Sequence, residues 1–417
     1  MNVTKNNKLT IKDIRKDFQT IEFDEKAINC KNKVISQGEI EYQIKKIIQY
    51  IINNIRYDRK DAIFPADPRI FNSNPLNVFN GAWGIIYSLN KLRVDIPSKL
   101  LFKVLNYNIN SSKYTSGLYV GTSGIAWVLL ELSLKEETER IMNIGENHKL
   151  MFDSPGIFFG ASGYGLTCLK FYLKTSDVEW LKKAKKIGER LMESAIKVDD
   201  NKYCWKHIDG DTHLGYGEGA TGISLFLLYL SIISGEYKYL EVGTKALEFD
   251  ISYLKTSEEG ILGMQRGVAG NVEKVITSYW DEGTAGVLTS VLRYWKGTKN
   301  DKYLILAKSL IKDVSRKYAA FPGLFMGLSG LGNALIDAYQ FIGDKEYLKE
   351  AYKVATGVSL FAINENNGIS YPGEQLFRKS TDFGTGSSGI ALFYNRLLNA
   401  ETKYNNFNFV LDEVFKE

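Results

Sequence analysis

The stretch that decides the fold is "SYWDEGTAGVLTSVLRYW", residues 278–295. Two aromatic residues and two acids precede a four-residue bracket with glycine at both ends, and an apolar run follows it. Such a bracket, leading into a largely apolar run, occurs seven times in the chain: "GAWG" (81–84), "GTSG" (121–124), "GASG" (160–163), "GATG" (219–222), "GTAG" (283–286), "GLSG" (327–330) and "GSSG" (386–389). A unit repeated in this way indicates a repeat architecture, and runs that are apolar all round predict helices buried on both sides.

Amphipathic segments rich in Lys and Glu alternate with these apolar runs. Four of them open in a similar way: "SDVEWLKKA" (176–184), "GEYKYLEVGTKA" (235–246), "NDKYLILA" (300–307) and "GDKEYLKEA" (343–351). A polar residue at the start suits the free amides and the dipole of a first helical turn. With "EIEYQIKKIIQYIINNI" (39–55) as the first member, the order is outer then inner, seven times over.

This alternation predicts an all-α fold, a closed α/α toroid of seven outer and seven inner helices. Residues 39–417 would form this one domain, and residues 1–38 would be a lead-in segment. The glycine brackets would mark the N-terminal ends of the inner helices, where small residues allow close approach around the ring. Those ends also present free amide groups and positive dipole at the mouth of a central cavity.

The spacing of the brackets points to a functional face. The intervals before the fourth, fifth and seventh brackets carry about twenty residues more than the short ones, within 202–218, 260–282 and 368–383. Long loops on a rigid scaffold commonly carry binding and catalysis. We expect what little strand there is to lie in these loops.

Composition narrows the class of protein. The formal charge of +5 reflects 53 basic against 48 acidic side chains, which does not favour a nucleic-acid partner. Three cysteines without disulfide-like spacing suit a reducing compartment. The polar N-terminus and the lack of a long apolar run predict neither a signal peptide nor a membrane partner, and therefore a cytoplasmic location.

The seven brackets in order resemble the lanthionine synthetase C-like family, over roughly residues 39–400. Within it, "IRYDRKDAIFPADPRIF" (55–71) and "DFGTGSSGI" (382–390) resemble the cyclase domain of class III lanthipeptide synthetases. The resemblance implies intramolecular Michael addition of Cys thiols to dehydroalanine or dehydrobutyrine in a dehydrated precursor peptide, giving lanthionine or labionin rings. It also implies lyase and kinase domains as partners, in cis or in trans. Because residues 1–38 are too short for either, we expect an isolated cyclase domain or a partner acting in trans.

The zinc ligands of the family's zinc-dependent members are replaced here. Their two Cys and one His correspond to Asp281, Phe325 and Met326. A Phe and a Met cannot serve as thiolate and imidazole, so the resemblance implies a zinc-independent cyclase with no metal and no cofactor. The His that those members carry before the fourth bracket is Glu218, and the acid before their third bracket is Gly156, with Asp153 nearby.

The chemistry requires a base or a positive field for a thiol that titrates near about 8.5, and a proton donor for the enolate. Two acids that crowd each other could supply the base, so we expect Asp281 and Glu218 to face each other across the cavity mouth. The predicted catalytic residues are Asp281, Glu218, Glu282, Tyr279, Tyr216 and His213. The predicted substrate-binding residues are Trp280, Arg378 and Asp382.

Several other interpretations remain open. Cys204, His207 and His213 have the ligand types of a relocated zinc site, whereas His148 is expected at the surface. Two matches to G-x-G-x-x-G, at 217–222 and 384–389, belong to the brackets and have no strand before them, which argues against nucleotide binding. The rival functions are a non-catalytic peptide-binding platform and a carbohydrate-acting toroid with paired carboxylates.

Overall fold

The computed structural model describes residues 34–415, except for residues 72, 147, 259, 269–274 and 403–406. Residues 35–417 form one compact unit, in which apolar inner helices alternate with amphipathic outer helices. The inner helices are α4 (Ala82–Lys91), α6 (Thr122–Glu131), α8 (Ala161–Thr175), α10 (Ala220–Ser234), α12 (Thr284–Thr298), α14 (Leu328–Ile342) and α16 (Ser387–Leu398). The outer helices are α3 (Gln37–Asn53), α5 (Ser98–Leu105), α7 (Lys135–Glu146), α9 (Val178–Ser194), α11 (Tyr237–Ile251), α13 (Asp301–Val314) and α15 (Lys345–Ser359). The α/α architecture expected from the repeat is confirmed.

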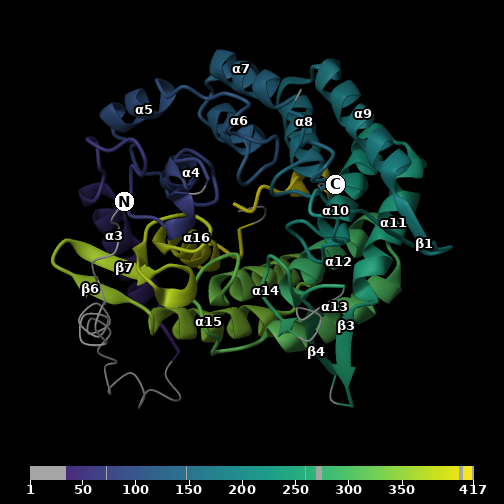
Figure 1. Ribbon diagram of the computed structural model, residues 1–417. Coiled ribbons are helices and arrows are strands. Elements are labelled where there is room, and N and C mark those ends of the chain that lie inside the picture. The colour runs from purple at the N-terminus through teal and green to yellow at the C-terminus, as the bar shows by residue number, and fades with distance from the viewer. Residues whose placement is uncertain are drawn as a thin grey trace, which may run out of the picture. The chain divides into compact units, whose positions relative to one another are not determined.

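The inner helices follow one another around the unit, as Figure 1 shows. Each inner helix contacts the next, and α16 contacts α4. The outer helices from α7 to α15 each pack against the inner helix that precedes them in the chain, because a short turn folds the chain back. Helix α3 instead packs against α16, so the first outer helix covers the last inner one. The order along the chain is outer then inner, as predicted, while in space each outer helix from α7 to α15 packs on the inner helix before it.

Polar residues begin several outer helices in the manner predicted. The side chains of Asp177, Asn300 and Asp344 each accept a hydrogen bond from the amide two residues later, at the starts of α9, α13 and α15. Each such cap contributes about 1 kcal/mol to helix stability. Glu236 precedes α11 without a side-chain cap.

Each glycine bracket begins an inner helix, as predicted. The first glycine is the N-cap residue of its helix in all seven cases. The second lies against the carbonyl oxygen of the residue six positions earlier, and a Cβ at Gly286 would overlap the oxygen of Trp280. The brackets therefore consist of small residues because the preceding loop folds closely over the helix end.

A closed cycle of backbone hydrogen bonds joins the seven loops just before the brackets. We call it the backbone belt. Its bonds run from amide to carbonyl oxygen over 2.7–3.2 Å: Phe79 to Tyr119, Val120 to Phe158, Phe158 to Gly217, Gly217 to Asp281, Asp281 to Phe325, Phe325 to Gly384, and Gly384 to Phe79. Because each loop is bonded to the next, the belt fixes the relative positions of the residues at the inner-helix starts.

The C-terminal segment 407–415, which ends in the short helix η4 (Asp412–Phe415), lies inside the ring of inner helices (Figure 1). We call it the internal tail. The ring of Phe409 stacks on Tyr87 at 4.3 Å and meets Trp127 edge-on at 5.3 Å. The carbonyl oxygen of Asn408 accepts a hydrogen bond from Tyr119 Oη at 3.1 Å. The internal tail is therefore part of the hydrophobic core.

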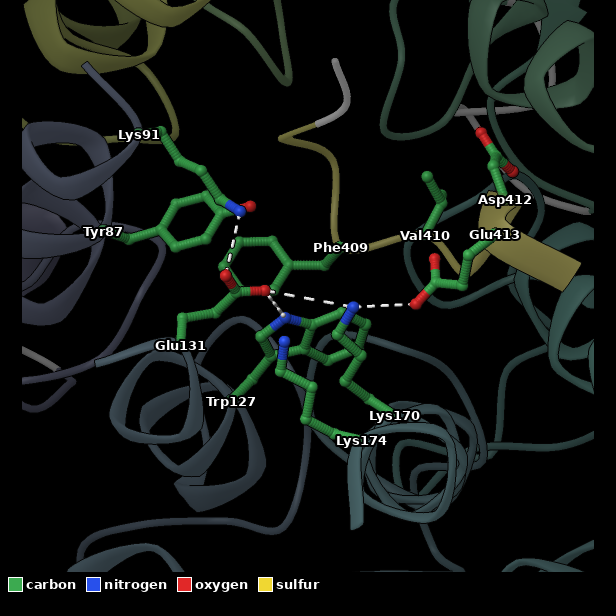
Figure 2. Close-up of a pocket in the computed structure, with 10 residues that line it drawn as sticks. All are labelled: Tyr87, Lys91, Trp127, Glu131, Lys170, Lys174, Phe409, Val410, Asp412 and Glu413. Atoms are coloured by element: carbon green, nitrogen blue, oxygen red, sulfur yellow. Dashed lines mark hydrogen bonds and ion pairs between the residues drawn. The ribbon is translucent and has the colours of Figure 1, made fainter. Parts of the chain in front are cut away.

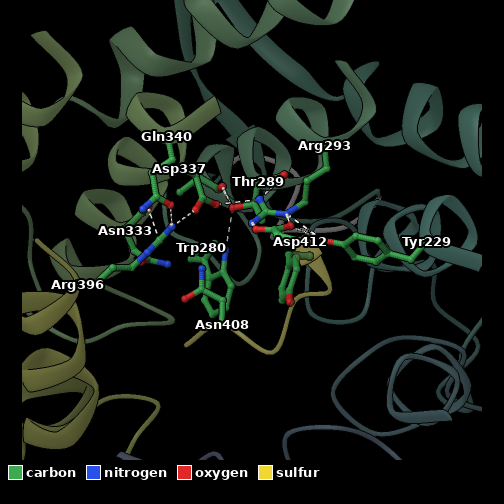
Figure 3. Close-up of polar contacts among 12 residues, drawn as sticks. Tyr229, Trp280, Thr289, Arg293, Asn333, Asp337, Gln340, Arg396, Asn408 and Asp412 are labelled. Carbon is green, nitrogen blue, oxygen red and sulfur yellow. Dashed lines mark hydrogen bonds and ion pairs between the residues drawn. The ribbon is translucent and has the colours of Figure 1, made fainter. Parts of the chain in front are cut away.

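A buried charged network holds the end of the internal tail (Figure 3). Arg293 donates to both carboxylate oxygens of Asp412, at 2.8 and 2.6 Å, and to Asp337 at 2.8 Å. Arg396 binds the other oxygen of Asp337. Burial alone would raise the pKa of Asp337, but the two guanidinium groups outweigh burial and lower it. Removing one partner from such a network is costly because a buried charge is left unpaired.

The strands of the described chain lie in the three long loops, as expected. One hairpin pairs β1 (Ile196–Asp199) with β2 (Lys202–Cys204). The loop before the fifth bracket forms β3 (Leu254–Ser257), β4 (Gly260–Gln265) and β5 (Ile276–Thr277), and the loop before the seventh forms β6 (Ile363–Glu365), β7 (Gly368–Pro372) and β8 (Lys379–Ser380). All pairs are antiparallel. Within the described residues, every helix is too short or too polar to cross a membrane.

Candidate functional site

Glu218 lies immediately before the glycine that caps α10, with its side chain 17% exposed. Its Oε1 accepts a hydrogen bond from the amide of Phe159 at 3.1 Å, and its Oε2 lies 3.2 Å from Nδ1 of His207. A Cβ at Gly156 would lie 2.8 Å from Oε1 of Glu218. The glycine therefore leaves the space into which this carboxylate fits.

Asp281 belongs to the backbone belt and is half-buried. Its carbonyl oxygen accepts hydrogen bonds from the amides of Tyr216 and Gly217, at 2.8 and 3.0 Å. Its Oδ1 lies against Gly217, where a Cβ would overlap it. Asp281 and Glu218 thus lie on either side of Gly217, but the carboxylate of Glu218 is turned towards Phe159 and His207.

Three further predicted residues lie in the rim loops with partial or full exposure. Glu282 forms an ion pair with Arg266. The Oη of Tyr279, a half-buried residue, accepts a hydrogen bond from the amide of Ala320 at 3.3 Å. Arg378 is exposed in the loop before the seventh bracket. These side chains surround the bracket end of the ring without converging on one point.

Tyr216, Trp280 and Asp382 are fully buried. Tyr216 stacks on Trp280 at 4.6 Å, and burial raises the pKa of Tyr216 well above its usual value. The carboxylate of Asp382 accepts hydrogen bonds from Thr385, Gly386 and Asp67 amides at 2.7, 3.0 and 3.1 Å. It therefore fixes the loop just before α16 and ties the segment around Asp67 to the seventh bracket. These positions favour a structural role for the three residues.

Phe325 is central to an aromatic cluster on the ring axis. Its ring lies within 4.7–6.0 Å of five others, which belong to Phe79, Tyr119, Phe158, Trp280 and Phe383. Phe325 itself is fully buried. The positions that hold zinc ligands in the zinc-dependent relatives therefore do not fit zinc here, since one of them is packed into this cluster. Aromatic side chains from the loops of the belt therefore pack together around Phe325.

His213 and His207 pack ring against ring in the loop before the fourth bracket, with centroids 4.5 Å apart. Nε2 of His213 lies 2.8 Å from Oδ2 of Asp209. Cys204 is buried, and burial raises the pKa of its thiol. In the described part of the chain no three His, Cys, Asp or Glu side chains are grouped closely enough to hold a metal, so these residues do not form the alternative zinc site.

Two residues that the sequence reasoning did not assign a catalytic or positioning role contribute to the site. One is His207, considered only as a metal ligand. The other is Asp250 of α11, whose Oδ2 accepts the amides of Gly215 and Thr221 at 2.9 and 2.7 Å and so fixes the loop that carries Glu218. Burial raises the pKa of Asp250 to about 7. It lies on the inward stripe of α11 with Tyr239, Gly243, Ala246 and Leu247, and a carboxylate on that stripe was the available signal.

A polar hollow of about 260 Å³ lies at the other end of the inner helices (Figure 2). Lys91 and Glu131, the last residues of α4 and α6, form an ion pair of 3.0 Å there. Lys170 pairs with Glu413 of the internal tail at 2.8 Å. Lysines near helix C-termini interact favourably with the negative end of the helix dipole. No predicted site residue lines this hollow, so the bracket end remains the candidate site.

The fold places this protein among the α/α toroids, and two solved structures of that class are similar to it. Nisin cyclase matches with a TM-score of 0.62 and 18% identity, over 90% of this chain and 97% of the other. A family 76 glycoside hydrolase from a bovine Bacteroides thetaiotaomicron strain matches with a TM-score of 0.51 and 14% identity, over 88% and 78%. At these identities the likeness concerns the fold alone.

The sequence, in contrast to the fold, shows to which family the chain belongs. Residues 74–411 match the model of the lanthionine synthetase C-like protein family, and the chain belongs to that family. A curated relative, a probable SapB synthase from Streptomyces coelicolor, is 22% identical over 354 residues. The alignment covers 80% of this chain but 35% of that protein, so the chain spans about a third of the relative's length.

Proposed function

We propose that the chain is a zinc-independent lanthipeptide cyclase domain of the class III type. It would add Cys thiols of a dehydrated precursor peptide to dehydroalanine or dehydrobutyrine and close lanthionine or labionin rings. The observation that carries the proposal is family membership together with two half-buried acids, Glu218 and Asp281, at the starts of α10 and α12. Phe325 and Met326 at the relatives' ligand positions support independence from zinc.

The proposed chemistry uses the rim of the belt. The starts of α10 and α12 provide a positive field that favours the thiolate of an approaching Cys. Glu218 and Asp281 supply the base or electrostatic function, either directly or through a neighbouring group that they hold in place, and Tyr279 or His213 donates to the enolate that forms on addition. Arg378, exposed on a neighbouring loop, is the proposed contact for the rest of the peptide. Tyr216, Trp280 and Asp382 would act by holding the rim in place.

The proposed partners follow from the length of the relative. Because the chain corresponds to about a third of the probable SapB synthase, the dehydrating lyase and kinase activities would reside in other domains, in cis or in trans. The precursor peptide would reach the cyclase after dehydration. A cytoplasmic location is also proposed, because the thiols of the precursor peptide must stay reduced.

The test is ring closure in a peptide that contains one Cys and one dehydroalanine. Cyclisation leaves the mass unchanged but removes the thiol, so alkylation followed by mass spectrometry measures it. Heat-denatured protein gives the uncatalysed background. Peptide binding without any loss of alkylation would favour the peptide-binding platform. Release of sugar from an oligosaccharide, with no effect on the peptide, would favour the carbohydrate-acting toroid.

A further inference from the structure

His207 lies beside Glu218, and a second of the chain's three histidines, His213, packs against it, in a line of four titratable side chains. Nδ1 of His207 is 3.2 Å from Oε2 of Glu218, and the ring of His207 packs edge-on against that of His213. His213 in turn contacts Asp209 through Nε2 at 2.8 Å. The line runs from the start of α10 outwards through the loop before the fourth bracket.

The inner pair of this line is mostly buried and the outer pair is exposed. The side chain of His207 is 5% exposed and that of Glu218 is 17% exposed, whereas those of His213 and Asp209 are 39% and 48% exposed. Oε2 of Glu218 is buried and has no hydrogen-bond partner among the described residues, although Nδ1 of His207 is within ion-pair distance. A protonated Nδ1 is the donor that this oxygen lacks, and a small rotation of the ring would align the two.

The backbone holds His207 in place. Its amide donates to the carbonyl oxygen of Asp211 at 2.9 Å, and its carbonyl oxygen accepts from the amide of Gly210 at 2.8 Å. The loop is fixed at its far side by a bridge between His213 and Gly267. The imidazole is therefore presented on a rigid turn, with Nδ1 3.2 Å from the carboxylate of Glu218.

Resting on the proposed cyclase function, we propose that His207 is the proton-transfer residue of the site. Glu218 would be its positioning residue, accepting Nδ1–H so that Nε2 carries the lone pair that takes the thiol proton. His213, itself in contact with Asp209, would keep the ring of His207 in place. An imidazole suits this task near neutral pH better than a carboxylate, because its ordinary pKa lies closer to that of a thiol.

The step balances without a further reactant. Nε2 of His207 takes the proton from the Cys thiol, and the sulfur forms a C–S bond to Cβ of dehydroalanine as its C=C π bond breaks. The electron pair moves into the adjacent carbonyl as an enolate. Nε2–H then returns the proton to Cα, which restores the carbonyl and the neutral imidazole.

The experiment replaces the imidazole and then supplies it from solution. We expect His207→Gln and His207→Ala to slow ring closure by about 100- to 10,000-fold with little change in KM for the peptide. Added imidazole should restore activity to His207→Ala, whereas pyrazole, which has the same shape but is a far weaker base, should not. The matched control is His148→Gln, which changes the third histidine in a loop beyond α7 and should leave the rate unchanged.

Each outcome is decisive. Unchanged rates in both His207 variants, rescue by neither azole, or equal rescue by both would overturn the role of His207 while leaving the cyclase function in place. If His207→Ala does not fold, as judged by circular dichroism, the rate of the Gln variant decides alone. Failure of the wild-type protein to cyclise the peptide would overturn the proposed function and this inference together.

Discussion

Replacing Phe409 by Ala tests whether the internal tail is part of the core. Phe409 is 2% exposed, stacks on Tyr87 at 4.3 Å and meets Trp127 and Phe383 edge-on at 5.3 and 5.8 Å. Truncating a buried Phe costs about 3–5 kcal/mol, and aromatic pairs contribute about 0.5–1.5 kcal/mol beyond burial. We therefore expect the free energy of unfolding to fall by about 4 kcal/mol.

Urea unfolding followed by far-ultraviolet circular dichroism measures this loss as a lower midpoint at an unchanged slope. Tryptophan fluorescence gives an independent measure, since Trp127 touches the deleted ring. The control is Phe377→Ala, at a residue 67% exposed, which should change stability by less than about 0.5 kcal/mol. A loss below about 1 kcal/mol for Phe409→Ala would refute the reasoning, because a ring packed as observed cannot be removed so cheaply.

Three further predictions concern the site. Asp281→Asn and Glu218→Gln should each slow ring closure by about two to four orders of magnitude while leaving the fold intact; wild-type rates in the alkylation assay would reduce both acids to helix caps. Asp250 has a folded pKa of about 7, about three units above its ordinary value, so wild-type stability should fall by about 4 kcal/mol relative to Asp250→Asn as pH rises from about 4 to above 7. Urea midpoints that stay parallel for the two proteins over this pH range would contradict this. Dialysis against a chelator should leave the rate of ring closure unchanged, and a loss restored by added zinc would count against the assignment based on Phe325 and Met326.

The fold was largely predictable because its signal is local and repeated. Each bracket combines glycines with an apolar run, and each inner helix begins at the first glycine of its bracket. The internal tail could not be predicted in this way. Its segment "FNFVLDEVF" (407–415) has no bracket and no helical repeat, and its partners Tyr87 and Arg293 lie more than a hundred residues away. Local periodicity carries no information about such distant contacts.

The site was predictable to the level of the loop, but not to the direction of each side chain. Trp280 and Asp281 are neighbours in the chain, yet Trp280 is fully buried and Asp281 is half-buried. Both residues lie in the turn between β5 and α12, where a difference of one position separates the core from the rim. The direction is set by the backbone belt, whose bonds join residues 38 or more positions apart and leave no trace in the local sequence.

By sequence position alone, this rim lacks both the acid and the imidazole that the resemblance assigns to the zinc-dependent relatives, because Gly156 and Glu218 stand at those two positions. The geometry leads to a different conclusion. Gly156 has no side chain, but the carboxylate of Glu218 occupies the space beside it. Glu218 is not an imidazole, but His207 brings one to 3.2 Å from that carboxylate. An acid and a histidine therefore meet at the start of α10, although they come from other sequence positions than in those relatives. If His207 transfers the proton as proposed, the chemistry depends on which groups meet at the start of α10, and the loop from which each comes is secondary.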